Sequence, residues 1–123
     1  MYPRLHSVSI TTSTAGAGTG YTDVDHGRIL SVQLASTNLG STGSVAYTNE
    51  TTSEAILTKA PATTKAVYYP RPVVCNSTGG AIKVSTGASI PDYFYLSDHR
   101  VKISLAGVSV GTAKTATFRV TVG

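Results

Sequence analysis

The sequence has no tryptophan, a single cysteine and few charged residues. Because a disulfide needs two cysteines, Cys75 excludes an internal disulfide, and the fold must be held together by its core. No apolar run approaches the ~18 residues of a membrane-spanning helix, and no basic segment followed by a long apolar run marks a secretory leader. We therefore expect a protein that is made in a cytoplasm and has no membrane partner.

Helix signals are also missing. No window of eleven or more residues keeps apolar side chains at the i, i+3, i+4, i+7 spacing of an amphipathic helix. Serine and threonine together make up roughly a quarter of the chain, which is typical of β structure. The 123 residues allow one core. We predict a single all-β domain over residues 1–123, an antiparallel β-sandwich or flattened barrel with negligible helix.

The last quarter of the chain carries the clearest strand pattern. Residues 101–105 and 115–122 both place apolar side chains at every second position, so each predicts a strand with one buried face. Gly107 and Gly111 leave room for a reversal between them. We expect these two strands to form a hairpin that closes a sheet.

Shorter runs of the same period predict the remaining strands, for a total of seven or eight. They lie at residues 5–12, 28–34, 44–48, 54–58, 65–69 and 81–85. Residues 1–4 are expected to form a mobile N-terminal arm. The small and polar Gly/Thr-rich residues 12–20 are expected to form a flexible surface loop. Their glycines lack the spacing and the following helix of a phosphate-binding motif, so we do not expect a nucleotide site there.

Asp23, Asp25 and His26 form the densest polar cluster in the sequence. Oxygen and nitrogen ligands this close could hold a hard cation, but the ligand spacing of a calcium loop is absent. Aspartate and Gly27 also suit a turn, since aspartate bonds its own backbone and glycine accepts positive φ. We favour the turn and expect no metal and no cofactor.

The sequence contains no recognisable set of catalytic residues. His6 falls on the margin of a predicted strand, and His26 and His99 fall in predicted turns. No G-x-S-x-G nucleophile motif and no zinc-ligand spacing occurs. Cys75 follows two valines and is expected to be a small buried apolar residue. The formal net charge of +4 is spread singly along the chain, which does not favour nucleic acid as a partner. We expect no enzyme activity.

Two aromatic segments leave alternatives open. Tyr93, Phe94 and Tyr95 could form a binding face or fill the end of a sandwich; in an extended segment Phe94 would face away from the other two. After residues 65–69, Pro70 and Pro72 mark a sheet edge or a bend, because proline cannot donate to a central ladder.

The whole chain resembles a family of small proteins encoded beside the major capsid gene in tailed bacteriophages. The order and spacing of five stretches carry the resemblance. They are Gly27-Arg28-Ile29-Leu30-Ser31-Val32, Thr52-Ser53-Glu54-Ala55-Ile56-Leu57, Tyr68-Tyr69-Pro70-Arg71-Pro72 with Gly79-Gly80, His99-Arg100-Val101-Lys102-Ile103, and Thr117-Phe118-Arg119-Val120-Thr121-Val122-Gly123. The aromatic residues before Arg100 are more numerous than this family leads us to expect.

The resemblance implies a virion structural protein, a decoration (cement or minor capsid) protein on the outer surface of the phage head. Its implied partners are the major capsid protein and further copies of itself, in a dimer or trimer. We expect the contact surface to come from the two aromatic segments: Tyr68, Tyr69, Pro70, Arg71, Tyr93, Phe94 and Tyr95. The alternatives are a head-completion or tail component, and a carbohydrate-binding β-sandwich, which the absence of tryptophan argues against.

Overall fold

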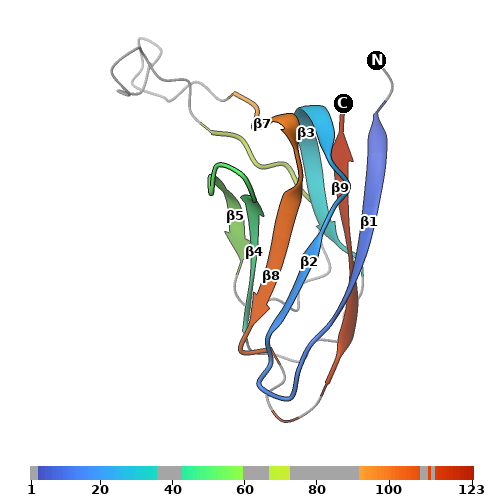
Figure 1. The fold of residues 1–123 in the computed structure, drawn as a ribbon, viewed down its shortest axis with the longest axis vertical. Coiled ribbons are helices and arrows are strands. Elements are labelled where there is room, and N and C mark those ends of the chain that lie inside the picture. Colours follow the sequence, from blue (N-terminus) through green and yellow to red (C-terminus); the bar gives the residue numbers. More distant parts are fainter. Residues whose placement is uncertain (1–2, 36–42, 60–66, 73–91, 109–110, 112) are drawn as a thin grey trace.

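A computed structural model describes residues 3–35, 43–59, 67–72, 92–108, 111 and 113–123. These residues form nine strands in two antiparallel sheets that pack face to face, and they contain no helix (Figure 1). The sheets do not close into a barrel, so the prediction of an all-β sandwich is confirmed. Within the described ranges no helix could cross a membrane.

One sheet has five strands, in the order β1-β9-β3-β6, and β7 pairs with β3 beyond the end of β6. Its strands are β1 (Arg4–Thr11), β9 (Thr115–Val122), β3 (Asp25–Leu34), β6 (Val67–Tyr68) and β7 (Tyr95–His99). The second sheet has four strands in the order β2-β8-β4-β5. These are β2 (Gly18–Tyr21), β8 (Val101–Ala106), β4 (Ser44–Asn49) and β5 (Ala55–Lys59).

The core lies between the sheets and is built by the alternating apolar side chains of both. Phe118 of β9 and Tyr47 of β4 meet across it edge to face, with ring centroids 6.2 Å apart and planes inclined by 75°. Ile29, Val32, Ile103 and several valines complete this fully buried layer. One cluster therefore joins both sheets, as the period-two pattern predicts.

The expected hairpin between residues 101–105 and 115–122 is wrong. β8 belongs to the four-stranded sheet and β9 to the five-stranded sheet, so the connection after Ala106 crosses from one layer to the other (Figure 1). A hairpin within one sheet and two strands in opposite sheets would bury the same alternate side chains. The pattern therefore identifies the buried face of each strand and leaves its hydrogen-bonded neighbour undetermined.

The expected flexible loop over residues 12–20 is also wrong in its second half, where Gly18 begins strand β2. A Cβ on Gly20 would lie 2.6 Å from Val8 Cγ1, and one on Gly18 would lie 2.7 Å from Ile10 Cγ2. The glycines thus let β2 pass closely over the core side chains of β1 where the chain changes sheets. Residues 1–4 were expected to form a mobile N-terminal arm, but Arg4 is instead the first residue of β1.

Replacing Gly20 by alanine should therefore destabilise the protein, although alanine normally costs less backbone entropy than glycine. The added methyl group must displace stiff β-branched side chains, and we expect a loss of about 1–3 kcal/mol in the free energy of unfolding. Thr19→Ala, on the exposed face between the two glycines, is the control and should change stability by less than about 0.5 kcal/mol. Urea unfolding measures both, and a Gly20→Ala protein as stable as the wild type would contradict this packing.

Three further sequence predictions have different outcomes. The predicted strand at 65–69 is described only as β6, Val67–Tyr68, just before Pro70. β7 was not expected as a strand, and Asp98 within it has a positive φ of 56°. The predicted strand at 81–85 and the burial of Cys75 lie outside the described residues.

Candidate interaction surface

The two aromatic segments predicted to form a contact surface lie against the same edge of β3. β6 pairs with Val32 and Gln33, and β7 pairs with the beginning of β3. Between these two pairings, Ile29 N donates a hydrogen bond to Phe94 O (2.8 Å), and Asp92 N donates to Pro72 O (2.7 Å). Residues 67–72 and 92–96 therefore form one continuous border of the five-stranded sheet.

Tyr93 lies at the centre of this border, between two arginines. The guanidinium carbon of Arg71 is 4.3 Å from the centroid of the Tyr93 ring, and that of Arg28 is 4.9 Å from it. Both distances are within the range of cation–π attraction. Arg71 Nη1 also donates to Pro70 O (2.7 Å) and Leu30 O (3.1 Å). Arg71 thereby satisfies strand-edge carbonyls and holds the Tyr93 ring.

The structure divides the predicted contact residues into exposed and buried ones. Tyr69 and Tyr95 are 68% and 55% exposed, whereas Phe94 is buried in the core, as expected from the opposite direction of neighbouring side chains. Pro70 is buried, and Tyr68 packs against the core beneath Lys59 Nζ, which is 5.5 Å from its ring centroid. The exposed tyrosines therefore lie above three buried or core-packed residues, Phe94, Pro70 and Tyr68.

We call the outer part of this border the aromatic–arginine surface; it consists of the exposed Arg28, Tyr69 and Tyr95 and the half-buried Arg71 and Tyr93. Arg28 was not among the predicted contact residues. It lies in β3, directly opposite Tyr95 in the ladder but far from it in sequence, and only the strand pairing reveals the contact. The Asp92 carboxylate accepts hydrogen bonds from Tyr93 N (2.8 Å) and Tyr95 Oη (3.5 Å), which orders the segment leading into β7.

A second polar group gathers where β1 and β3 begin. Arg4 Nε donates to both carboxylate oxygens of Asp25 (3.0 and 2.8 Å), and His6 Nε2 donates to Asp25 Oδ2 (2.8 Å). The Asp25 side chain is only 9% exposed. Hydrogen bonds, above all from Arg4, hold the pKa of the Asp25 carboxyl well below its usual range, against the opposing effect of burial.

The expected turn at Asp23, Asp25 and His26 is therefore only partly correct. Asp25 and His26 belong to β3, and the Asp25 carboxylate binds two side chains of β1 in addition to the backbone N–H of His26 (2.7 Å). Gly27 does adopt a positive φ, 130°. The cross-strand partners of Asp25 come from β1, about twenty residues earlier, so the local motif could not indicate them.

The remaining polar contacts tie β4, β7 and β8 together at the same end of the sandwich. Arg100 forms an ion pair with Glu50, and its guanidinium carbon lies 4.0 Å from the ring centroid of Tyr21. The hydrogen bond from Arg100 lowers the pKa of Glu50. Buried Asn49 donates from Nδ2 to His99 Nδ1 (3.0 Å), and its Oδ1 accepts the backbone N–H groups of the following turn.

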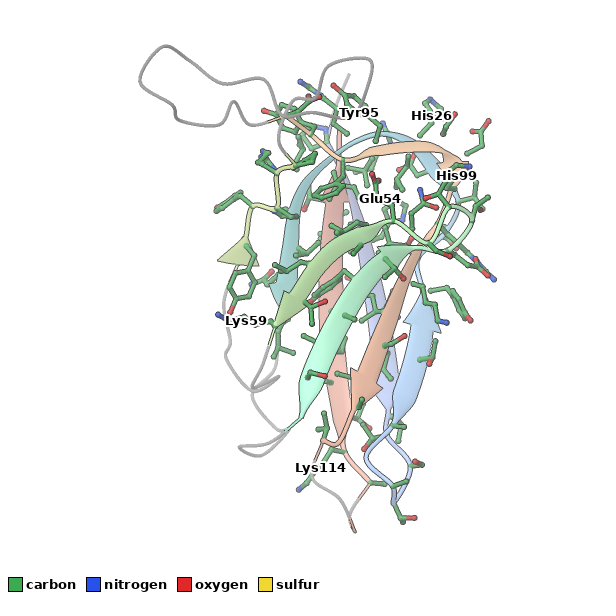
Figure 2. The ribbon with its side chains drawn as sticks, turned by 90° about the vertical axis from the view of Figure 1, so that its left-hand side faces the viewer. His26, Glu54, Lys59, Tyr95, His99 and Lys114 are labelled. Carbon is green, nitrogen blue, oxygen red and sulfur yellow. The ribbon has the colours of Figure 1, made fainter. Side chains whose placement is uncertain are left out.

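His26, His99 and Tyr95 lie toward this end, and Lys114 marks the opposite end (Figure 2). His26 and His99 lie in β3 and β7, so the expectation that both occupy turns is wrong. Within the described ranges, no group of three or more histidine, cysteine, aspartate or glutamate side chains is placed to hold a metal ion, and no pocket is present. What the aromatic–arginine surface does offer is a group of tyrosine and arginine side chains above buried residues of the core.

Comparisons of the chain with protein-family models, with curated proteins and with solved structures found no match in any of the three.

Proposed function

We propose that this protein is a capsid decoration protein, a virion structural protein that binds the outer surface of a phage head and stabilises the shell. The sequence resemblance supports this role, and so do two sheets with hydroxyl groups on their outer faces. On β1 and β9, for example, Ser9 Oγ lies 3.4 Å from Thr117 Oγ1, and Thr11 Oγ1 lies 2.9 Å from Thr115 Oγ1. Such faces suit wet contacts repeated over a lattice.

The aromatic–arginine surface is the observation that carries the proposal. Tyrosine and arginine dominate the binding energy of protein interfaces, because they supply large contact areas together with hydrogen-bond donors. Arg71 and Tyr93 are already held by the backbone carbonyls and by each other, so little side-chain entropy is lost when a partner binds. The exposed Tyr69 and Tyr95 rings then provide the apolar area for the major capsid protein.

Many identical sites on a shell allow each contact to be weak. Copies joined to one another bind a lattice through several sites at once. Once one copy is bound, the next is held at a high effective concentration near its own site, which increases the overall affinity for the shell. A decoration protein of this kind needs no bound cofactor and no chemistry. Its place is the capsid surface of the virion, after synthesis in the host cytoplasm.

Tyr69→Ala and Tyr95→Ala should each weaken binding to purified undecorated shells by about tenfold, equivalent to about 1.4 kcal/mol, because each removes an exposed ring from the contact. Tyr21→Ala is the matched control, since it removes another exposed tyrosine from the four-stranded sheet. Shell occupancy measured by co-sedimentation at several protein concentrations gives the affinities. Unchanged occupancy for both variants would contradict a role of this surface in binding.

Electron microscopy of the virion separates the capsid role from its alternatives. On the order of hundreds of copies over the shell support decoration, because a symmetric lattice repeats its sites. About a dozen or fewer copies at one vertex or on the tail would replace decoration by a head-completion or tail role. Reproducible binding to a glycan array, in the absence of shell binding, would instead favour the carbohydrate-binding module.

A further inference from the structure

The described strand edges of the two sheets differ in how well they are guarded against pairing with another chain. β6 has two residues and is followed by Pro70 and Pro72, and the pairing of β7 with β3 contains a register shift beside Asp25. β2 has four residues, and the pairing of β5 with β4 contains a register shift. Short strands, prolines and bulges are the usual guards of an edge.

β1 has none of these guards within its length of eight residues, and Pro3 directly precedes it. It pairs with β9 in an unbroken register from Arg4 to Thr11, and it lies at the outer border of the five-stranded sheet (Figure 1). The described residues place no strand in register with its other side. An exposed, regular edge of this length is a template for another strand.

The direction of the free backbone groups follows from the hydrogen bonds at the end of the ladder. Thr12 N donates to Lys114 O (2.7 Å), which continues the pairing of Thr11 with Thr115 by one residue. Because bonded and non-bonded pairs alternate along an antiparallel ladder, the even-numbered residues of β1 bond to β9. The N–H and C=O groups of Leu5, Ser7 and Ser9 therefore point away from the sheet.

The far end of this edge is already covered. Gly18 of β2 passes so closely that a Cβ there would lie 3.3 Å from Thr11 O, so the part of this edge that remains for pairing extends at most from Leu5 to Ser9. Its odd-numbered side chains are exposed and uncharged, and Leu5 is 60% exposed. His6, between them, is engaged with Asp25. The open stretch thus combines free backbone groups, an exposed apolar side chain and no repelling charge.

We propose that this stretch of β1 pairs antiparallel with β1 of a second copy, about a two-fold axis that passes midway between the two Ser7 residues. In this register Ser7 faces Ser7 of the second copy, and Leu5 faces Ser9 on either side. These three pairs are the outward-pointing residues, so each can exchange two backbone hydrogen bonds, about six in all. The two five-stranded sheets then become one continuous sheet, and the hydroxyl-rich outer faces of both copies lie on the same side.

A second copy suits this edge because the strand is its own complement. The axis brings a neutral stretch against itself, and the nearest exposed charge on that face is Arg119, which pairs with Ser7 on β9. At a strand spacing of about 4.8 Å, the two Arg119 backbone positions would lie about 14 Å apart. That exceeds the Debye length of ~8 Å at physiological ionic strength, so their repulsion is largely screened. Self-association through β1 does not depend on a capsid role.

Ser7→Pro tests the pairing directly, because it removes an N–H group that points away from β9 and leaves the β1–β9 ladder complete. Ser7→Lys is the second variant; it places like charges opposite each other at the axis. Ser7→Thr keeps the N–H group and the hydroxyl and is the matched control. Sedimentation equilibrium up to about 0.5 mM protein measures association, since an edge contact this small is expected to be weak.

We expect the wild type and Ser7→Thr to show a mass that rises with concentration from one chain toward two, and Ser7→Pro and Ser7→Lys to remain monomeric. If Ser7→Pro fails to fold, as seen from its circular dichroism, Ser7→Lys decides. A wild type that stays monomeric throughout would overturn the proposal and leave the edge to an extended segment of another protein. Association that persists in both variants would also overturn it, by placing the contact elsewhere.

Discussion

Replacing Phe118 by alanine is expected to lower the free energy of unfolding by about 3–5 kcal/mol. Phe118 lies in β9 between Val8 of β1 and Leu34 of β3, and its side chain is 0% exposed. Its ring meets Tyr47 from the other sheet. The substitution removes apolar area and leaves a cavity where the two layers touch, and β-sheet backbones on both sides limit how far the site can collapse.

The loss is large compared with the total stability of a domain of this size, which is about 5–15 kcal/mol. Chemical denaturation followed by tyrosine fluorescence or circular dichroism measures it. Phe118→Leu refills most of the cavity and should cost clearly less, and Arg119→Ala, the exposed neighbour on the same strand, should change stability by less than about 0.5 kcal/mol. A Phe118→Ala protein within about 1 kcal/mol of the wild type would contradict a core shared by both sheets.

Asp25→Asn is expected to cost about 2 kcal/mol at neutral pH, because it removes a nearly buried carboxylate that accepts hydrogen bonds from Arg4 and His6. Asparagine has almost the same shape but one acceptor oxygen fewer and no charge. The substitution removes the ion pair of Arg4 with Asp25 at the start of β1, while Arg4 Nη2 still donates to His26 O (2.6 Å). The effect is therefore a loss of charge pairing between β1 and β3.

The same substitution should change how stability depends on pH. The folded-state pKa of Asp25 is lowered, so its contribution is complete above the ordinary aspartate pKa of about 3.9 and is lost progressively as the pH falls below that value. The difference between wild type and Asp25→Asn should thus be constant near neutral pH and shrink in acid. Urea unfolding at pH 7 and at about pH 2.5 measures it.

Asp23→Asn provides the control for this experiment. Asp23 is exposed and only two residues away, so its substitution should cost less than about 0.5 kcal/mol at both pH values. A difference between wild type and Asp25→Asn that did not change on acidification would show that Asp25 acts through shape alone. Equal effects of the two substitutions would show that the contacts of Asp25 with Arg4 and His6 contribute nothing specific to stability.

Part of the candidate surface could be recognised from the sequence alone. Clustered tyrosines beside Pro70 and Arg71 indicate a sheet border with contact residues, and an extended segment at Tyr93 to Tyr95 must send Phe94 the opposite way, as it does. The contacts of Tyr93 with Arg71 and Arg28 could not be recognised. They join segments about twenty and more than sixty residues apart, and no local pattern encodes which segments share the edge of β3.

The sequence alone determined the all-β class of the fold, since period-two hydrophobicity and the lack of helical spacing leave a sandwich or a flattened barrel of strands as the way to bury these side chains. It also determined which face of each long strand is buried. Only the tertiary structure decided which strands are neighbours: that β8 and β9 belong to opposite sheets, that β2 needs glycines to pass over β1, and that Asp25 meets Arg4 and His6. The physical reason is that burial acts on each strand separately, whereas pairing, close approach and charge contacts depend on elements brought together from distant parts of the chain.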